Sequence, residues 1–165
     1  MRVAFLITPI GLGTAGLSEA QTAPEPAPAV VAGRFIDGQL SDSAFRHRHC
    51  VAAGFGDCPG GVQIVRGYRL GEGGRGRDTV RYVVEFQVIG IVGVSEAAPF
   101  FMPRTWVDSG AVLLVRRGAR WMVRLPGSRS DEQVRTTADV ARGYFDLDET
   151  DRSLLDTAVA APRRP

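Results

Sequence analysis

Hydrophobic residues recur along the chain with two different periods, and the change of period predicts two kinds of secondary structure. From Pro26 to His49 they return every three to five positions, as on the apolar face of a helix. We expect this stretch to be helical, in one piece or in two, because Ser41 and Asp42 are residue types that cap the start of a helix. From residue 62 onward hydrophobic and polar residues alternate, as in strands with one buried face.

The alternation predicts about four strands. They cover residues 62–70, 79–89, 106–116 and 120–125. The second is the strongest, and its apolar face carries Val80, Tyr82, Val84, Phe86 and Val88. Arg117 to Arg120 form a tight turn between the last two strands, and successive strands joined by turns favour an antiparallel sheet. An unusually apolar connection, residues 91–103, is expected between the second and third strands.

Helical spacing returns after Pro126, where the sequence predicts the end of the sheet. Residues 131–144 and 148–160 each have apolar residues along one side, and residues 161–165 are expected to fray. The order predicts an α+β fold: N-terminal helices packed on a curved antiparallel sheet of about four strands, with two C-terminal helices. The length of 165 residues fits one domain, which we place at residues 29–160.

The N-terminus has the charged, apolar and small-residue order of a secretory signal. Arg2 precedes about fifteen uncharged, largely apolar residues, which end at the small residues around Ala20. We therefore expect a signal peptide at residues 1–20, a proline-rich spacer at 21–28, and a periplasmic or secreted protein. The apolar run is too short, and too broken by Pro9, to span a membrane.

Two glycine patterns resemble a dinucleotide-binding loop. Gly11 to Gly16 match G-x-G-x-x-G, and Asp37 follows about twenty residues later. That loop must lead into a helix, but three closely spaced prolines within residues 24–28 would break one. The second match, Gly71 to Gly76, precedes a strand and is expected to be a flexible hairpin loop. We expect no cofactor.

Charge does not indicate nucleic-acid binding. The 20 basic residues are all arginines, scattered along the chain and balanced by 18 acidic residues, for a net charge of +2. We expect no nucleic-acid partner.

Cys50 and Cys58 are the two cysteines of the chain. In an oxidising compartment an even count favours a disulfide, which would stabilise so short a loop by roughly 2–3 kcal/mol. A metal site with His47 and His49 is the alternative, but residues two apart point to different faces of a helix and no C-x-x-C pair is present. We expect no metal.

The order of elements resembles the nuclear transport factor 2-like superfamily. The helix around Val31–Leu40, the strand Thr79–Ile89 and the strand beginning at Arg120 and Trp121 carry the resemblance, which covers about residues 28–126. It implies a cystatin-like cone, with helices over a pocket on the concave face of the sheet. The family includes isomerases, dehydratases and binding modules, so the resemblance implies a pocket more than a reaction. The C-terminal helical pair departs from the usual plan.

Asp108 and Tyr82 are the candidates for catalysis. Asp108 shares strand parity with Trp106, and an inward carboxyl in apolar surroundings would have a raised pKa, as a proton-abstracting base requires. The alternative is that the sequence Asp-Ser-Gly at 108–110 forms a bend that exposes Asp108, while Tyr82 belongs to the core.

The apolar connection supplies candidates for ligand binding: Phe100, Phe101 and Met102, with Tyr82 and Trp106. The first three would gate a pocket, form a contact surface, or pack on the C-terminal helices. We therefore expect a non-enzymatic exported module that binds a small apolar ligand or another envelope protein. The alternative is a cofactor-free isomerase or dehydratase-like enzyme that uses an inward Asp/Tyr pair.

Overall fold

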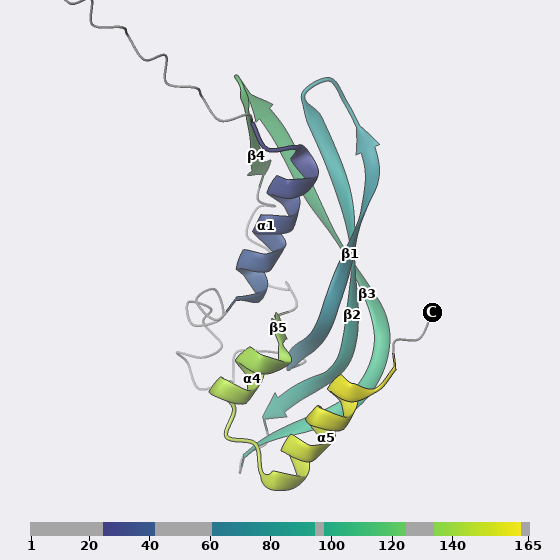
Figure 1. Ribbon diagram of the computed structural model, residues 1–165, viewed down its shortest axis with the longest axis vertical. Coiled ribbons are helices and arrows are strands. Elements are labelled where there is room, and N and C mark those ends of the chain that lie inside the picture. Colours follow the sequence, from purple (N-terminus) through teal and green to yellow (C-terminus); the bar gives the residue numbers. More distant parts are fainter. Residues whose placement is uncertain (1–24, 42–60, 95–97, 125–133, 163–165) are drawn as a thin grey trace, which may run out of the picture.

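The computed structural model describes residues 25–41, 61–94, 98–124 and 134–162. Along the chain the elements are α1 (Pro28–Leu40), β1 (Val62–Arg75), β2 (Thr79–Val94), β3 (Pro99–Arg117), β4 (Arg120–Arg124), β5 (Arg135–Thr137), α4 (Ala138–Tyr144) and α5 (Glu149–Ala160). The expected α+β class is confirmed. Figure 1 shows a strongly curled sheet with α1 on its concave side and α4 and α5 at the far end.

The five strands form one mixed sheet in the order β4-β3-β2-β1-β5. The first four are antiparallel neighbours, as expected. The fifth strand was not expected, and it runs parallel to β1, with residues 63–65 opposite 135–137. The prediction of a helix over residues 131–144 is therefore wrong at 135–137. Three residues are too few to show a strand period, and the pairing is reinforced by the Gln63 amide, which donates to the Val134 carbonyl at 3.0 Å.

Two strands are longer than the sequence pattern predicts. The expected loop at Gly71–Gly76 is wrong for most of its length, because β1 continues to Arg75 and pairs there with β2. The expected connection at residues 91–103 is also mostly strand, since β2 extends to Val94 and β3 begins at Pro99.

The starts of the helices carry residues that favour them. α1 has a proline in its first turn, and the Thr137 side chain accepts a hydrogen bond from the Val140 amide at the start of α4. Asp148 caps α5 in the same way through the Asp151 amide, so the expected helix at 148–160 is confirmed to within one residue.

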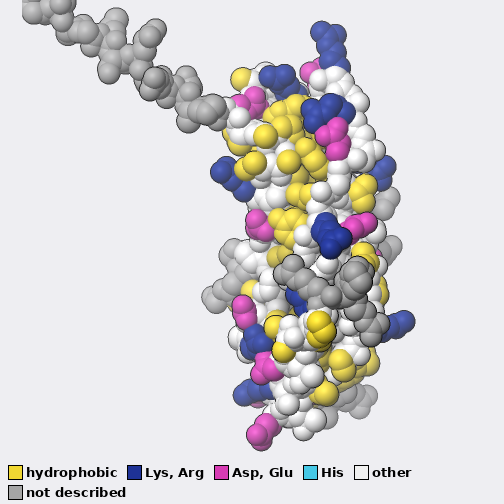
Figure 2. All heavy atoms as spheres, turned by 45° about the vertical axis from the view of Figure 1, so that its right-hand side comes forward, with side chains coloured by type: hydrophobic (Ala, Val, Ile, Leu, Met, Phe, Trp, Pro, Cys, Tyr) yellow, Lys and Arg dark blue, Asp and Glu magenta, His cyan; other side chains and the backbone are white. Residues whose placement is uncertain are grey.

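The core consists of two clusters that meet along β1 and β2, where Val65 and Val88 belong to the first cluster and Ile64 and Ile89 to the second. In the first, α1 covers alternate residues of β2, among them Val80, Val84 and Val88, together with side chains of β1 and β3. In the second, α4 and α5 cover Ile64, Ile89 and neighbouring residues. On the face shown in Figure 2, hydrophobic side chains gather near the α1 end, among charged side chains of both signs.

Several expectations fall on residues outside the described ranges. These are the signal peptide and most of the spacer, a second N-terminal helical piece, the Cys50–Cys58 pair with His47 and His49, and the end of the C-terminal tail. Among the residues that are described, no helix is long and apolar enough to cross a membrane.

Candidate functional site

The concave face of the sheet brings Tyr68, Phe86 and Asp108 into one row. Phe86 of β2 lies opposite Tyr68 of β1 and opposite Asp108 of β3. Phe86 is 5% exposed, and its ring lies 6.4 Å from that of Tyr68, centroid to centroid. Polar groups therefore flank a buried aromatic ring on both sides.

On the β1 side of this row, the Tyr68 hydroxyl meets the last turns of α1. It donates to Asp37 Oδ1 at 2.8 Å and lies 3.2 Å from the Gly33 carbonyl oxygen. Burial, and then the hydrogen bond and negative charge of Asp37, raise the pKa of Tyr68 to about 12. The phenol therefore keeps its proton at neutral pH and acts as a hydrogen-bond donor.

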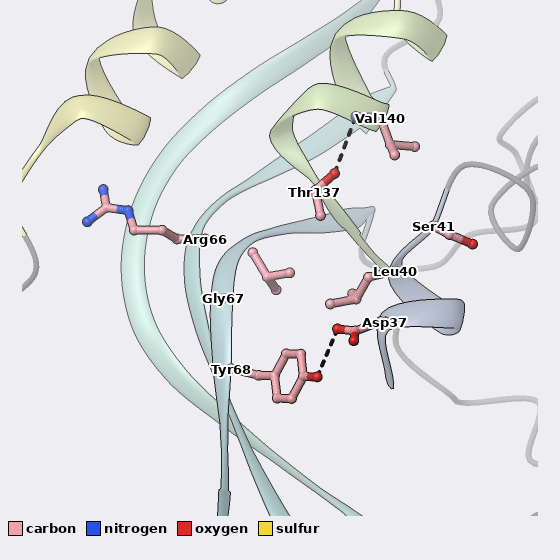
Figure 3. A pocket seen from close by; sticks show the side chains of 9 residues that line it. Asp37, Leu40, Ser41, Arg66, Gly67, Tyr68, Thr137 and Val140 are labelled. Atoms are coloured by element: carbon pink, nitrogen blue, oxygen red, sulfur yellow. Dashed lines mark hydrogen bonds between the residues drawn. The ribbon is translucent and has the colours of Figure 1, made fainter. Parts of the chain in front are cut away.

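A cavity of about 290 Å³ opens beside this pair, between α1, β1 and the start of α4. Its lining consists of Asp37, Leu40, Ser41, Val65, Arg66, Gly67, Tyr68, Thr137 and Val140. Figure 3 shows Asp37 and Tyr68 pointing toward each other at one side, while the Arg66 side chain extends to the opposite side of β1. There the Arg66 guanidinium donates to the Ala158 carbonyl of α5.

On the β3 side of the row, the Arg135 side chain contacts both Phe86 and Asp108. Its guanidinium carbon lies 4.6 Å from the centroid of the Phe86 ring, and it forms an ion pair with Asp108. The Ser109 amide also donates to Asp108 Oδ1 at 2.9 Å. The ion pair thus connects β5 with β3 across the two strands that lie between them.

The environment of Asp108 lowers its pKa. Burial alone would raise the pKa, but hydrogen bonds from Arg135, Gln63 and the Ser109 amide, together with the charge of Arg135, lower it below the ordinary value of 3.8. Asp108 faces the concave side, as the strand parity predicts, and its side chain is 29% exposed. The expected rise of its pKa is replaced by a fall, because a cation lies where apolar surroundings were expected.

The structure does not bring Asp108 and Tyr82 together. Tyr82 lies opposite Val112, whereas Asp108 lies opposite Phe86. Four residues of strand separate the two rows, or roughly 13 Å. Tyr82 is 5% exposed and belongs to the first core cluster.

The aromatic candidates for ligand binding are also dispersed. Phe101 is buried in the second core cluster against the C-terminal helices, whereas Met102 is 46% exposed. Phe100 is half-buried beside Gly93. Trp106 packs against the first cluster, with the Arg104 guanidinium 5.8 Å from its ring centroid. None of these residues lines the cavity beside Tyr68.

The residues that do line the cavity were missed by sequence reasoning. The alternation places Tyr68 in a strand and gives it no role, and Asp37 enters only as part of the pattern that resembles a dinucleotide-binding loop. One signal was available, since a tyrosine that alternates with apolar strand residues faces the core and needs a partner for its hydroxyl.

The described residues include no group of three or more His, Cys, Asp or Glu side chains that could hold a metal ion. Comparisons of the chain with protein-family models, with curated proteins and with solved structures found no match.

Proposed function

We propose that this domain is a non-enzymatic binding module whose cavity beside Tyr68 holds a small, largely apolar ligand with a cationic or hydrogen-bond-donating head. The observation that carries the proposal is the Tyr68–Asp37 pair at one side of an otherwise mainly apolar cavity. Binding pockets typically combine apolar walls with a few polar groups that orient the ligand.

The size of the cavity limits the ligand. A volume of about 290 Å³ corresponds to roughly ten water molecules and lies at the lower end of the range for ligand pockets. Leu40, Val65 and Val140 would contact the apolar part of such a ligand.

The charge of the cavity favours a donor over an anion. Asp37 is its acidic residue, and Arg66, the basic residue in the lining, directs its guanidinium to α5. Tyr68 uses its proton on Asp37, which leaves the remaining acceptor sites of that exposed carboxylate for a ligand. An ammonium or hydroxyl group would satisfy those sites, and a carboxylate ligand would be repelled.

The geometry gives less support to the alternative of an isomerase or dehydratase-like enzyme. A general base works best with a pKa near the operating pH, whereas Arg135 and its neighbours hold the pKa of Asp108 below 3.8. Export to the envelope remains a proposal that rests on the N-terminal sequence. The likeness to the cone-shaped superfamily also remains a proposal, supported by the position of α1 on the concave face.

Thermal unfolding of the full chain with three six-carbon probes tests the proposal: hexylammonium, hexanol and hexanoate. We expect hexylammonium to raise Tm most, hexanol less and hexanoate least. A concentration about one hundred times Kd should raise Tm by about 5–10 °C. The Asp37→Asn variant should respond equally to hexylammonium and hexanol.

Val140→Phe tests the location, because the larger ring would fill the cavity. Val159→Phe is the matched control, since Val159 lies on α5, outside the cavity, and is 37% exposed. We expect the first variant to lose the response to hexylammonium and the second to retain it. Equal responses of the two variants, or no response of the unmodified chain to any probe, would contradict the proposal.

A further inference from the structure

The face of the β2–β3–β4 sheet that lies opposite α1 carries a regular arrangement of arginines. Arg117 of β3 lies directly opposite Arg120 of β4. Two residues before Arg117 on β3, Val115 lies between Thr79 of β2 and Met122 of β4. Two residues before Val115, Leu113 lies between Arg81 of β2 and Arg124 of β4. We call Arg81, Arg117, Arg120 and Arg124 the arginine face.

The charge of the arginine face is not neutralised by its neighbours. All four side chains are exposed, and the three rows contain no Asp or Glu. Within the described part of the chain none of the four forms an ion pair. Like charges directly opposite each other in a sheet are destabilising, so the pairing of Arg117 with Arg120 favours a bound anion.

The apolar residues between the arginines are accessible. A groove of about 540 Å³ runs along the β3–β4 hairpin, and it is lined by Val115, Arg116, Arg117, Met122, Val123 and Arg124. Met122, one of these lining residues, is 49% exposed. The groove therefore offers apolar contact between positive charges, which fits a partner that alternates acidic and apolar groups.

β4 also ends the sheet. It is the last strand in the order of described strands, and Figure 1 shows it at the margin beside β3. Its alternate residues, Trp121 and Val123, pack against the first core cluster on the α1 side, which holds the strand in place. An ordered edge strand presents backbone N–H and C=O groups to which another strand can add.

We propose that β4 binds an acidic, extended segment of another polypeptide, which adds to the sheet as a further strand. In the matching register, acidic side chains of that segment lie beside Arg120 and Arg124, and an apolar side chain lies beside Met122. A strand partner is favoured over a lipid surface or a nucleic acid because the charges repeat with the two-residue period of a strand and lie on the last strand of the described part of the sheet. A second copy of the chain would bring arginine against arginine.

Fluorescence anisotropy with a labelled nine-residue peptide tests the proposal. The peptide has a central valine, glutamates two residues to either side of it, and threonines between them. We expect binding that weakens with salt, and a loss of about tenfold or more in affinity for the Arg120→Glu/Arg124→Glu variant. The same peptide with lysines in place of glutamates should bind the variant better than it binds the unmodified chain. Arg152→Glu on α5 is the control and should leave the affinity unchanged.

Two further measurements separate strand addition from simple charge attraction. An acidic peptide with an N-methyl group on every amide has no N–H donors at either edge, so it cannot pair along a strand and should not bind. Amide hydrogen exchange should slow in β4 when the unmodified peptide is bound. Equal binding of the N-methylated peptide would overturn the proposal, as would binding to vesicles of anionic lipid or to DNA without any binding of the peptide.

Discussion

At the scale of single residues, an ion pair with Arg135 holds the carboxylate of Asp108 across the two strands that lie between β3 and β5. The parity of Asp108 with Trp106 correctly predicts that it faces the concave side. Its partner, Arg135, lies 27 residues later on a three-residue strand, so alternation within one strand gives no information about it. The direction of the pKa shift depends on that partner: the pKa would be raised for an inward carboxyl in apolar surroundings, and it is lowered here because Arg135 lies beside the carboxylate.

The Asp108–Arg135 pair should make stability depend on pH in the acid range. Because the folded state lowers the pKa of Asp108, the stabilisation is present above the unfolded value of 3.8 and is lost as the pH falls through the folded value. We expect Asp108→Asn to lower the free energy of unfolding by about 1–2 kcal/mol at neutral pH. Urea unfolding should show this difference shrinking below about pH 4.

Asp146→Asn is the matched control for this measurement. Asp146 also pairs with an arginine, Arg152, but its side chain is fully exposed. Water and salt screen such a pair, so we expect no measurable change at any pH. A destabilisation by Asp108→Asn that stays constant down to pH 2 would show that the pair does not contribute through its charge.

At the scale of elements, the sequence predicts strands well where one face is buried and poorly where both are. Val80 to Val88 alternate and were predicted as a strand. From Ile89 to Val92, residues at both odd and even positions of the strand are buried. Ile89 is 2% exposed and Val92 is 1% exposed, so the alternation of buried and exposed residues disappears. The continuous apolar run suggests a connection between strands, although such a run is typical of a strand that is covered on both faces.

Gly90 allows this doubly covered part of the sheet to form. A Cβ at this position would lie 2.3 Å from two ring carbons of Phe101 and 2.7 Å from the Met102 carbonyl oxygen. The backbone atom cannot move away as a flexible side chain would. We therefore expect Gly90→Ala to lower the free energy of unfolding by about 1–3 kcal/mol, measured by the urea midpoint.

Gly74→Ala is the comparison for Gly90→Ala. Gly74 also lies in a paired strand, but a Cβ there meets no atom within 4 Å. We expect a change near zero or a small stabilisation from the reduced freedom of the unfolded chain. Similar losses at both positions would mean that strand propensity, and not the Phe101 contact, determines the effect.

At the scale of the whole molecule, one sheet supports two cores. The order of helix, sheet and helices was predictable because each class has its own period. The way the last two helices pack was not, since α4 and α5 contact residues of β1, β2 and β3 that are distant in the sequence. The resemblance covered only residues 28–126, yet Leu155 of α5 is completely buried, so the C-terminal helices are part of the folded core.

The two cores should unfold together, because β1, β2 and β3 contribute side chains to both of them. Leu155→Ala removes buried volume from the second core and should lower the free energy of unfolding by about 2–5 kcal/mol. The two tryptophans of the chain, Trp106 and Trp121, both pack against the first core, so their fluorescence reports the cluster that the mutation does not touch. We expect the fluorescence transition in urea to shift as far as the transition seen by far-ultraviolet circular dichroism.

Leu154→Ala, at a neighbouring position that is 39% exposed, should shift both transitions little. A fluorescence transition that stays in place in Leu155→Ala, while circular dichroism develops an earlier phase, would mean that the C-terminal helices detach from a sheet held by α1 alone.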